Sequence, residues 1–307
     1  MKCRFAPSLV LACALSAGLA QAAPPQRIFY SGHSLLEEPL PSGVAAIAAS
    51  LGTTVQWQRH TPFGSSMRDR AGAAPSLAGF DTLVVTEQHT LIGNLVWNDS
   101  VGQLQQLKAR FVAANPGART WFYASWLNLD DHTNPQRWLA YERAASPIWQ
   151  CLVARVNATR SGEQIAYLPA AALLAALVEQ VSRGGVPGVS VEALFSDDVH
   201  LSPLGAYFMS LVLFATLFER SAQGAAVPPG VDVQAARTLQ PMAWSLVQQE
   251  RAQREAVAPQ TCAERKRAFI APYAAYVRDV LEAPRIGRWR AWWQWAKYRW
   301  QWYWGLR

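Results

Sequence analysis

Long apolar runs and cysteine are both scarce in this 307-residue sequence, and no internal repeat is present. The one sustained apolar stretch near the start, residues 9–19, is about half the roughly 20 residues that a transmembrane helix needs. No other segment is long and apolar enough to span a bilayer. The sequence therefore predicts no membrane-spanning helix in the remainder of the chain.

The short apolar stretch has the flanks of an export signal. Lys2 and Arg4 precede it, and Ala-Gln-Ala at residues 20–22 follows it as a small-x-small cleavage site. We predict a signal peptide over residues 1–22 and a periplasmic or secreted mature protein. A retained transmembrane anchor and a lipid anchor on Cys13 are the alternatives.

Only Cys151 and Cys262 remain after removal of the signal. In an oxidising compartment these two residues could pair, or they could stay as separate thiols. The geometry of the fold decides between the two states.

Acidic residues are absent from residues 285–307, although the chain as a whole is mixed in charge. This segment contributes +6 and the signal +2 to the net charge of +7, so the body between them carries −1. A nucleic-acid enzyme would carry its positive charge on the working surface. We therefore expect no nucleic-acid partner.

Short β-rich runs alternate with longer helical stretches from residue 27 onward, a pattern typical of strand-helix-strand units. This predicts an α/β fold, a three-layer α/β/α sandwich with a mainly parallel central sheet and a C-terminal helical extension. A compositional break near residues 222–230 sets expected boundaries at residues 23–222 for the sandwich, 223–284 for the extension and 285–307 for a tail. Strands are expected at residues 27–30, 53–59, 82–86, 120–124 and 164–168, and helices at 43–51, 100–115, 136–155, 170–182 and 203–218.

A serine follows the first expected strand, in the sequence Gly-His-Ser-Leu at residues 32–35. Open parallel sheets build their sites at the carboxyl ends of their strands, so this position suits a nucleophile. Free backbone N–H groups at the start of the next helix could hold the oxyanion that forms when Ser34 attacks an ester. The alternative is a serine that only caps the helix.

A histidine suited to activating Ser34 lies near the other end of the sandwich. Asp197 precedes His200 by three residues in a loop that leads into a helix, so its carboxylate can reach one ring nitrogen. The other ring nitrogen could then accept the serine proton. The alternative is a histidine that only caps the helix.

These two motifs together resemble the SGNH/GDSL hydrolase superfamily. Residues 32–35 are similar to its first block, Gly-Asp-Ser-Leu, and residues 197–200 are similar to its last block, Asp-x-x-His. The resemblance covers roughly residues 27–220 and is nearest to a poorly characterised bacterial branch. It implies the flavodoxin-like fold of SGNH hydrolases, with Ser34 as nucleophile, His200 as base and Asp197 as the acid that orients it.

The two middle blocks of the superfamily are altered here. Gly64 holds the place of the glycine whose N–H joins the oxyanion hole, although it could equally be an ordinary loop glycine. The block Gly-x-Asn-Asp is replaced by Thr86-Glu87-Gln88-His89, which puts Gln88 in the place of the asparagine. Its amide can still donate to an oxyanion. We expect Glu87 to turn away and bond to the backbone or to an arginine.

Several other residues could ligate a metal ion. His89, Asp130, Asp131 and His132 carry suitable oxygen and nitrogen atoms, but their spacing matches no metal motif. We expect residues 130–135 to form a loop and a helix cap. The sequence thus predicts no metal and no cofactor.

The tail of residues 285–307 holds seven of the fourteen tryptophans. On a helix, Arg290, Gln294, Lys297 and Gln301 would form one polar stripe, with most of the tryptophans on the other side. Three alternatives follow: peripheral attachment to a membrane, packing of the aromatic rings on the sandwich, and a stacking platform for sugars.

The sequence predicts an exported serine esterase that cleaves or transfers acyl groups. The family resemblance implies carbohydrate O-acetyl groups, lipids or simple esters as substrates, and we favour an acetylated glycan. The alternative is a non-catalytic protein on the same fold that assists the assembly or export of an envelope polysaccharide.

Overall fold

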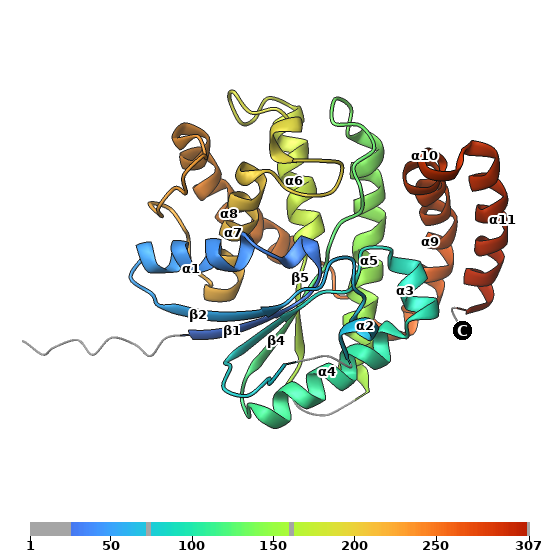
Figure 1. Cartoon of the computed structure of the whole chain (residues 1–307), viewed down its shortest axis with the longest axis horizontal. Helices are drawn as coiled ribbons and strands as arrows, with labels where there is room; N and C mark the ends of the chain where they lie inside the picture. Colours follow the sequence, from blue (N-terminus) through green and yellow to red (C-terminus); the bar gives the residue numbers. More distant parts are fainter. Residues whose placement is uncertain (1–25, 72–74, 160–162, 306–307) are drawn as a thin grey trace, which may run out of the picture.

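The computed structural model describes residues 26–71, 75–159 and 163–305, and the signal peptide expected at residues 1–22 lies outside this range. A parallel sheet of five strands in the order β2-β1-β3-β4-β5 forms its centre (Figure 1). The strands are β1 (Gln26–Ser31), β2 (Val55–His60), β3 (Thr82–Val85), β4 (Arg119–Tyr123) and β5 (Ile165–Leu168).

Helices cover both faces of the sheet. One layer contains α1 (Leu40–Ser50), α7 (Pro203–Phe218) and α8 (Val233–Gln253), which contact one another in that order. The other contains α2 (Met67–Ala71), α4 (Ser100–Ala114) and α5 (Gln136–Ala158), and α6 (Ala170–Ser182) packs beside α5 and α7. The strand order requires this division, because right-handed crossovers in opposite directions place their helices on opposite faces.

The core follows from where each element lies. All four residues of the central strand β3 are buried, as expected for a strand that is covered on both faces. Helix α7 is apolar around its whole circumference, and it is buried between α1 and α8. The predicted three-layer α/β/α architecture is thereby confirmed.

The expected elements agree closely with those observed. Each of the five strands begins and ends within two residues of its predicted position, and α6 and α7 match their predicted ranges. Helix α1 begins at Leu40, three residues before the expected start. The short helices α2 and α3 (Leu91–Trp97) were not predicted, because five and seven residues are too few to show a helical period.

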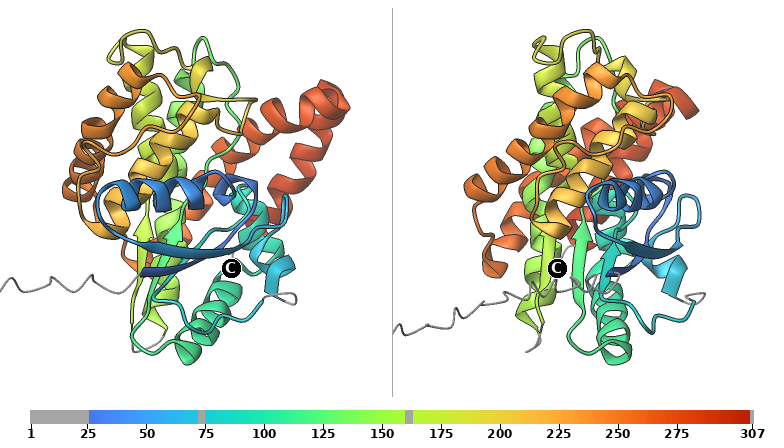
Figure 2. Two further views of the ribbon diagram at one scale, coloured as in Figure 1. Left: turned by 60° about the vertical axis from the view of Figure 1, so that its left-hand side comes forward. Right: turned by 90° about the vertical axis from the view of Figure 1, so that its left-hand side faces the viewer.

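The last helices form a hairpin beside the sandwich (Figure 2). It consists of α9 (Cys262–Val277), a π-helical turn (Arg278–Glu282), α10 (Ala283–Ile286) and α11 (Arg288–Gly305). Helix α9 packs against α5, and α11 packs against α9 and α3. None of the described helices is long and apolar enough to cross a bilayer.

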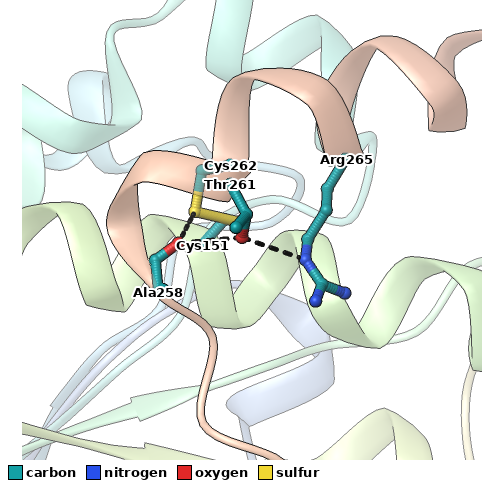
Figure 3. The surroundings of a disulfide bond; sticks show 5 residues. All are labelled: Cys151, Ala258, Thr261, Cys262 and Arg265. Atoms are coloured by element: carbon teal, nitrogen blue, oxygen red, sulfur yellow. Dashed lines mark hydrogen bonds between the residues drawn. A yellow bond between two sulfur atoms is a disulfide. The ribbon is translucent and has the colours of Figure 1, made fainter.

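A disulfide joins Cys151 of α5 to Cys262 at the start of α9 (Figure 3). The Cα atoms of the two residues lie 5.5 Å apart, a normal separation for a disulfide. Of the two alternatives that the sequence left open, the paired state is therefore the one observed. Both residues are buried, so the bond is shielded from solvent.

Candidate active site

Ser34 begins a short helical turn just after strand β1. The 3-10 turn Ser34–Leu36 lies at the carboxyl edge of the sheet, and the Ser34 side chain is half-buried there. There is no room for a side chain at Gly32, because a Cβ atom at this position would come within 2.8 Å of Leu36 Cβ and 3.0 Å of Thr86 Cγ2. Glycine therefore allows the chain to turn tightly enough to present Ser34.

The strand order places Ser34 at the point where the sheet changes direction. After β1 the chain crosses to β2 on one side, and after β2 it returns to β3 on the other side of β1. Open parallel sheets bind ligands outside the carboxyl ends of the two strands where the order reverses. Residues that follow β1, β2 and β3 therefore share this edge of the sheet.

Ser34, His200 and Asp197 are joined by two hydrogen bonds. Ser34 Oγ lies 3.0 Å from His200 Nε2, and His200 Nδ1 lies 2.7 Å from Asp197 Oδ2. A carboxylate only accepts hydrogen bonds, so Nδ1 carries the proton that it donates to Asp197. The lone pair of Nε2 is then directed at the serine hydroxyl. This arrangement can remove a proton from Ser34 when its oxygen attacks a carbonyl carbon.

The backbone of the histidine loop holds the Asp197 carboxylate. Asp197 Oδ1 accepts hydrogen bonds from the N–H groups of Val199, at 2.8 Å, and of His200, at 2.6 Å. Partial burial raises the pKa of Asp197, but these N–H donors and the His200 ring outweigh it, so the pKa lies below its usual value. Asp197 is therefore a carboxylate at neutral pH.

Asp198 is the adjacent acid, and it lies differently. Its backbone carbonyl accepts a hydrogen bond from Leu129 N–H at 2.7 Å, while its side chain is exposed and makes no hydrogen bond to a described residue. The acid that contacts His200 is thus Asp197 and not Asp198.

Residues after β4 hold the His200 loop against the sandwich. Trp126 Nε1–H donates to Val199 O at 2.8 Å, beside the bond from Leu129 N–H to Asp198 O. Leu127, between them, is fixed on both sides: its N–H donates to Glu142 Oε1 at 2.8 Å and its carbonyl accepts from Trp138 Nε1–H at 2.8 Å. These supports were not predicted, because they depend on tertiary packing; Trp126 and Val199, for example, are 73 positions apart in the sequence.

His33 fixes the turn that carries Ser34. Its ring is fully buried; Nε2 lies 3.0 Å from the Glu87 carbonyl, and Nδ1 accepts a hydrogen bond from Leu35 N–H at 3.4 Å. Burial is the main cause that lowers the pKa of His33 to about 3, and unfavourable electrostatic interactions with His89 and Arg70 add to it. The ring is therefore neutral, and its Nε2–H ties the serine turn to the end of β3. His33 lay within the quoted motif, but the sequence assigned it no role.

A buried arginine and a buried glutamate brace the loops beneath Ser34. Arg70 of α2 donates to Ser65 O at 2.7 Å, to Ser31 Oγ at 3.3 Å and to Thr86 O. Glu87 Oε1 accepts from the N–H groups of Met67 and Gln88, at 2.9 Å and 2.8 Å.

Glu87 thus turns away and bonds to the backbone, as expected from the sequence. Burial is the main cause that raises its pKa, and the Met67 N–H and the Arg70 charge oppose that rise. The loops after β2 and β3 are consequently held in fixed positions relative to Ser31 at the end of β1.

Gln88 keeps one donor available. Its Oε1 accepts hydrogen bonds from Thr90 N–H at 2.9 Å and from Asn94 Nδ2 at 2.7 Å. A backbone N–H can only donate, so the atom that accepts from Thr90 must be the oxygen of the Gln88 amide. The Nε2 group of that amide points away from Thr90 and Asn94. Nε2 makes no hydrogen bond to any described residue.

Gly64 occupies an exposed turn after β2. Its φ of +63° suits glycine, and space around it is open, since an added Cβ would meet nothing within 4 Å. The backbone N–H groups of Gly64 and of Ser34 both lack an acceptor among the described residues. Neither Gly64 nor Gln88 is hydrogen-bonded to the Ser34–His200–Asp197 group, and their contribution to an oxyanion hole stays a prediction.

Two further side chains border the site without having been predicted there. The ring of Phe63 is 80% exposed, and its centroid lies 6.1 Å from that of His200. His89 lies 5.8 Å from His33, and its Nδ1 is buried with no hydrogen bond to a described residue. Burial first, and then the charge of His200, lower the pKa of His89 to about 4, so its ring is neutral near pH 7.

The residues considered as metal ligands do not gather at one site, and their side chains make separate contacts with other parts of the protein. Asp131 Oδ1 accepts from Thr133 N–H at 2.8 Å and Asn134 N–H at 3.1 Å, as expected for a loop, and the His132 ring packs against Phe195. Asp130 lies near the Tyr276 hydroxyl, at 3.3 Å. Within the described ranges, no three His, Cys, Asp or Glu side chains are grouped closely enough to hold a metal ion.

Comparison with known proteins adds a likeness of fold. No protein-family model matches the sequence, and no curated protein matches it. Among solved structures, a DUF4886 family protein from Bacteroides uniformis superposes with a TM-score of 0.55 at 12% identity, over 73% of this chain and 95% of that chain. A "putative platelet activating factor" from Streptococcus pneumonia superposes with a TM-score of 0.43 at 13% identity, over 66% of this chain and 87% of that chain. The first of these likenesses shows a shared fold.

Proposed function

We propose that this protein is a serine hydrolase of the SGNH/GDSL kind, which cleaves or transfers acyl esters through an acyl-Ser34 intermediate. The observation that carries the proposal is the chain of hydrogen bonds from Ser34 through His200 to Asp197, at 3.0 Å and 2.7 Å. A capping serine and a capping histidine would have no reason to meet across 166 residues of sequence.

Each step of the reaction has a group suited to it. Ser34 Oγ attacks the ester carbonyl carbon while His200 Nε2 accepts its proton, and a tetrahedral intermediate forms. When this collapses, the bond to the leaving alkoxide breaks and the His200 imidazolium protonates that oxygen. Water, or the hydroxyl of an acceptor, then loses a proton to His200 as it attacks the acyl carbon, and the bond to Ser34 Oγ breaks while His200 returns the proton to that oxygen.

Three hydrogen-bond donors support an oxyanion hole at the same edge of the sheet. They are the backbone N–H groups of Ser34 and Gly64 and the Nε2 amide of Gln88, and none has an acceptor among the described residues. They follow β1, β2 and β3, which are neighbours in the sheet. Hydrogen-bond donors that have no partner in the free protein can stabilise the negative charge that develops on the carbonyl oxygen in the transition state.

The proposal places the protein outside the cytoplasm. The predicted signal peptide supports export, and so does the buried disulfide, since such bonds persist in oxidising compartments. The superfamily resemblance implies carbohydrate O-acetyl groups, lipids or simple esters as substrates. For an exported protein we favour the acetyl ester of a glycan.

Labelling with a fluorophosphonate tests the proposal, because this probe reacts only with an activated serine. The mature protein should be labelled, Ser34→Ala should not be, and Ser76→Ala, an exposed serine remote from His200, should be labelled like the wild type. Labelling that survives Ser34→Ala would contradict the assignment. No labelling of the wild type at all would favour the non-catalytic alternative, which is motivated by the replacement of the Gly-x-Asn-Asp block by residues 86–89.

A further inference from the structure

Helix α11 presents aromatic residues on two opposite sides. On the inner side Trp302 is buried, with ring centroids 5.8 Å from Trp97 of α3 and 5.1 Å from Tyr273 of α9. Tyr298 also packs on Trp97, at 5.4 Å. This inner face attaches the helix to the molecule, so the alternative of aromatic packing accounts for only part of the tail.

The outer side carries tryptophans that are exposed to solvent. Trp289, Trp293, Trp300 and Trp304 are 74%, 60%, 68% and 48% exposed. Their spacing of i, i+4, i+11 and i+15 places them along one stripe of a helix with 3.6 residues per turn. Rings of this size are seldom left in water, and a contiguous exposed apolar patch usually marks an interaction surface.

Cations border this stripe on both sides. With each residue advanced by 100° around the helix, Arg290 and Lys297 lie directly beside one edge of the stripe, and Arg288 and Arg299 lie farther round on the other side, beyond Trp292. All four are exposed, the helix contains no acid, and none of the four forms an ion pair with a described residue. The surface is therefore both aromatic and positively charged.

A groove beside the stripe has the same character. It lies between α9 and α11, has a volume of about 460 Å³, and is lined by residues that include Arg267, Arg299, Trp295, Trp300 and Tyr303. Two guanidinium groups over aromatic walls can hold a phosphate oxygen. The groove thus offers a place for an anionic headgroup next to the exposed tryptophans.

We propose that the outer face of α11, with the adjoining groove, docks on the surface of an anionic phospholipid bilayer. Tryptophan rings favour the level of the headgroups, and arginine and lysine favour the phosphates around them. The helix, about 27 Å long, would lie in the plane of the surface. Charge complementarity selects this partner, since a second copy of the same helix would bring four like charges against four.

Helix α11 packs on α3, the helix that follows one loop of the candidate site. Trp97, on which α11 packs, ends helix α3, and α3 begins at Leu91, directly after the loop of Gln88. Deleting α11 would therefore uncover Trp97 and Tyr273 and disturb the site. Substitutions on the outer face alone give the sharper test.

Sedimentation of the mature protein with vesicles tests the proposal. Vesicles of phosphatidylcholine with phosphatidylglycerol should bind the protein, vesicles of phosphatidylcholine alone should bind it far less, and added salt should weaken the binding. The variant Arg288→Glu, Arg290→Glu, Lys297→Glu should bind at least about a hundredfold more weakly. A matched control, Arg119→Glu, Arg220→Glu, Arg237→Glu, makes the same change in net charge with exposed residues outside α11, and it should bind within a few-fold of the wild type.

A second variant separates the aromatic contribution from the charge. Trp289→Ala, Trp293→Ala, Trp300→Ala should keep the circular dichroism spectrum and fluorophosphonate labelling of the wild type and lose most vesicle binding. Equal binding by this variant and the wild type would overturn the proposal, as would equal loss in the control triplet. A lipid-free dimer that the tryptophan variant converts to a monomer would also overturn it and assign the face to a second copy.

Discussion

Glu142 is a buried acid whose ionisation should weaken the fold as the pH rises. It lies on α5 with 1% of its surface exposed, and Oε1 accepts a hydrogen bond from Leu127 N–H at 2.8 Å. Burial raises the pKa of Glu142 from the usual 4.5 to about 8, and the bond from Leu127 opposes only part of that rise. The folded protein therefore keeps this proton over a range in which the unfolded chain releases it.

The size of the effect follows from the difference between the two pKa values. Between about pH 4.5 and pH 8 the unfolded chain binds fewer protons at this residue than the folded protein, so the free energy of unfolding falls as pH rises. Each pH unit costs up to about 1.4 kcal/mol, which over about 3.5 units gives an upper limit near 5 kcal/mol. Above pH 8 both states are ionised, and the loss is complete.

The substitution Glu142→Gln keeps an oxygen for Leu127 N–H and removes the charge. At pH 4.5 this variant and the wild type should differ by less than about 1 kcal/mol, and at pH 9 the variant should be the more stable by several kcal/mol. Lys266 complicates absolute values, because burial lowers its pKa to about 8 and adds stability between pH 8 and 10.5. The difference between variant and wild type removes that contribution, since Lys266 is present in both.

Urea unfolding at a series of pH values, followed by circular dichroism, measures this difference. Glu192→Gln, an exposed glutamate, is the control and should follow the wild type at every pH. Parallel profiles for Glu142→Gln and the wild type would refute the reasoning. Since Leu127 lies between Trp126 and Leu129, which hold the His200 loop, fluorophosphonate labelling at pH 9 should also be faster in Glu142→Gln.

Three further predictions concern turnover of an aryl acetate. Ser34→Ala and His200→Ala should each lower kcat/KM by about a thousandfold or more, whereas Asp197→Ala should leave a measurable remainder because it only orients the base; steady-state kinetics would contradict this if Ser34→Ala kept full turnover. Gln88→Ala should lower kcat about a hundredfold at nearly constant KM, and a raised KM alone would assign Gln88 to substrate binding instead. Phe63→Ala should raise KM by about tenfold with kcat nearly unchanged, because its exposed ring beside His200 can only cover a bound substrate; an unaltered KM would remove it from the site.

Much of the sandwich was predictable because its signals are local. Strand β3 is a short apolar run, β2 alternates apolar and polar residues at its start, and α4 ends at Asn115-Pro116-Gly117, where proline prevents further helix. Asp197 and His200 are neighbours in sequence, so their contact depends on a single turn. The meeting of His200 with Ser34 follows once both are assigned to the carboxyl edge of the same sheet.

The supports of the site were not predictable, because they depend on tertiary packing. Nothing near Arg70 in the sequence indicates that a charged side chain is buried under Ser34 and bonded to three separate segments. The sequence likewise gives His33 no role of its own, because its hydrogen bond from the serine turn to the Glu87 carbonyl forms only in the folded protein. The roles of such residues depend on hydrogen-bond partners that come close only when the chain is folded.

The tail shows a different limit of sequence periodicity. The helical wheel predicts a polar stripe that includes Gln294 and Gln301, and both are half-buried, with Gln294 Nε2 donating to the Tyr298 hydroxyl at 3.1 Å. The exposed side carries the other two members of that stripe, Arg290 and Lys297, together with a row of tryptophans. Hydrophobic periodicity identifies two unlike faces of a helix, but it assumes that the apolar one is the face turned inward.

The disulfide between α5 and α9 changes what a cut in the backbone would do. The segment of residues 254–258 between α8 and Cys262 has no regular structure and is partly exposed, so it is an accessible place for a protease. A nick there would not release the C-terminal hairpin, because Cys151 and Cys262 would still join the two pieces. The nicked protein would migrate as one species on a non-reducing gel and as two after reduction, while its tryptophan face stayed attached to the rest of the molecule.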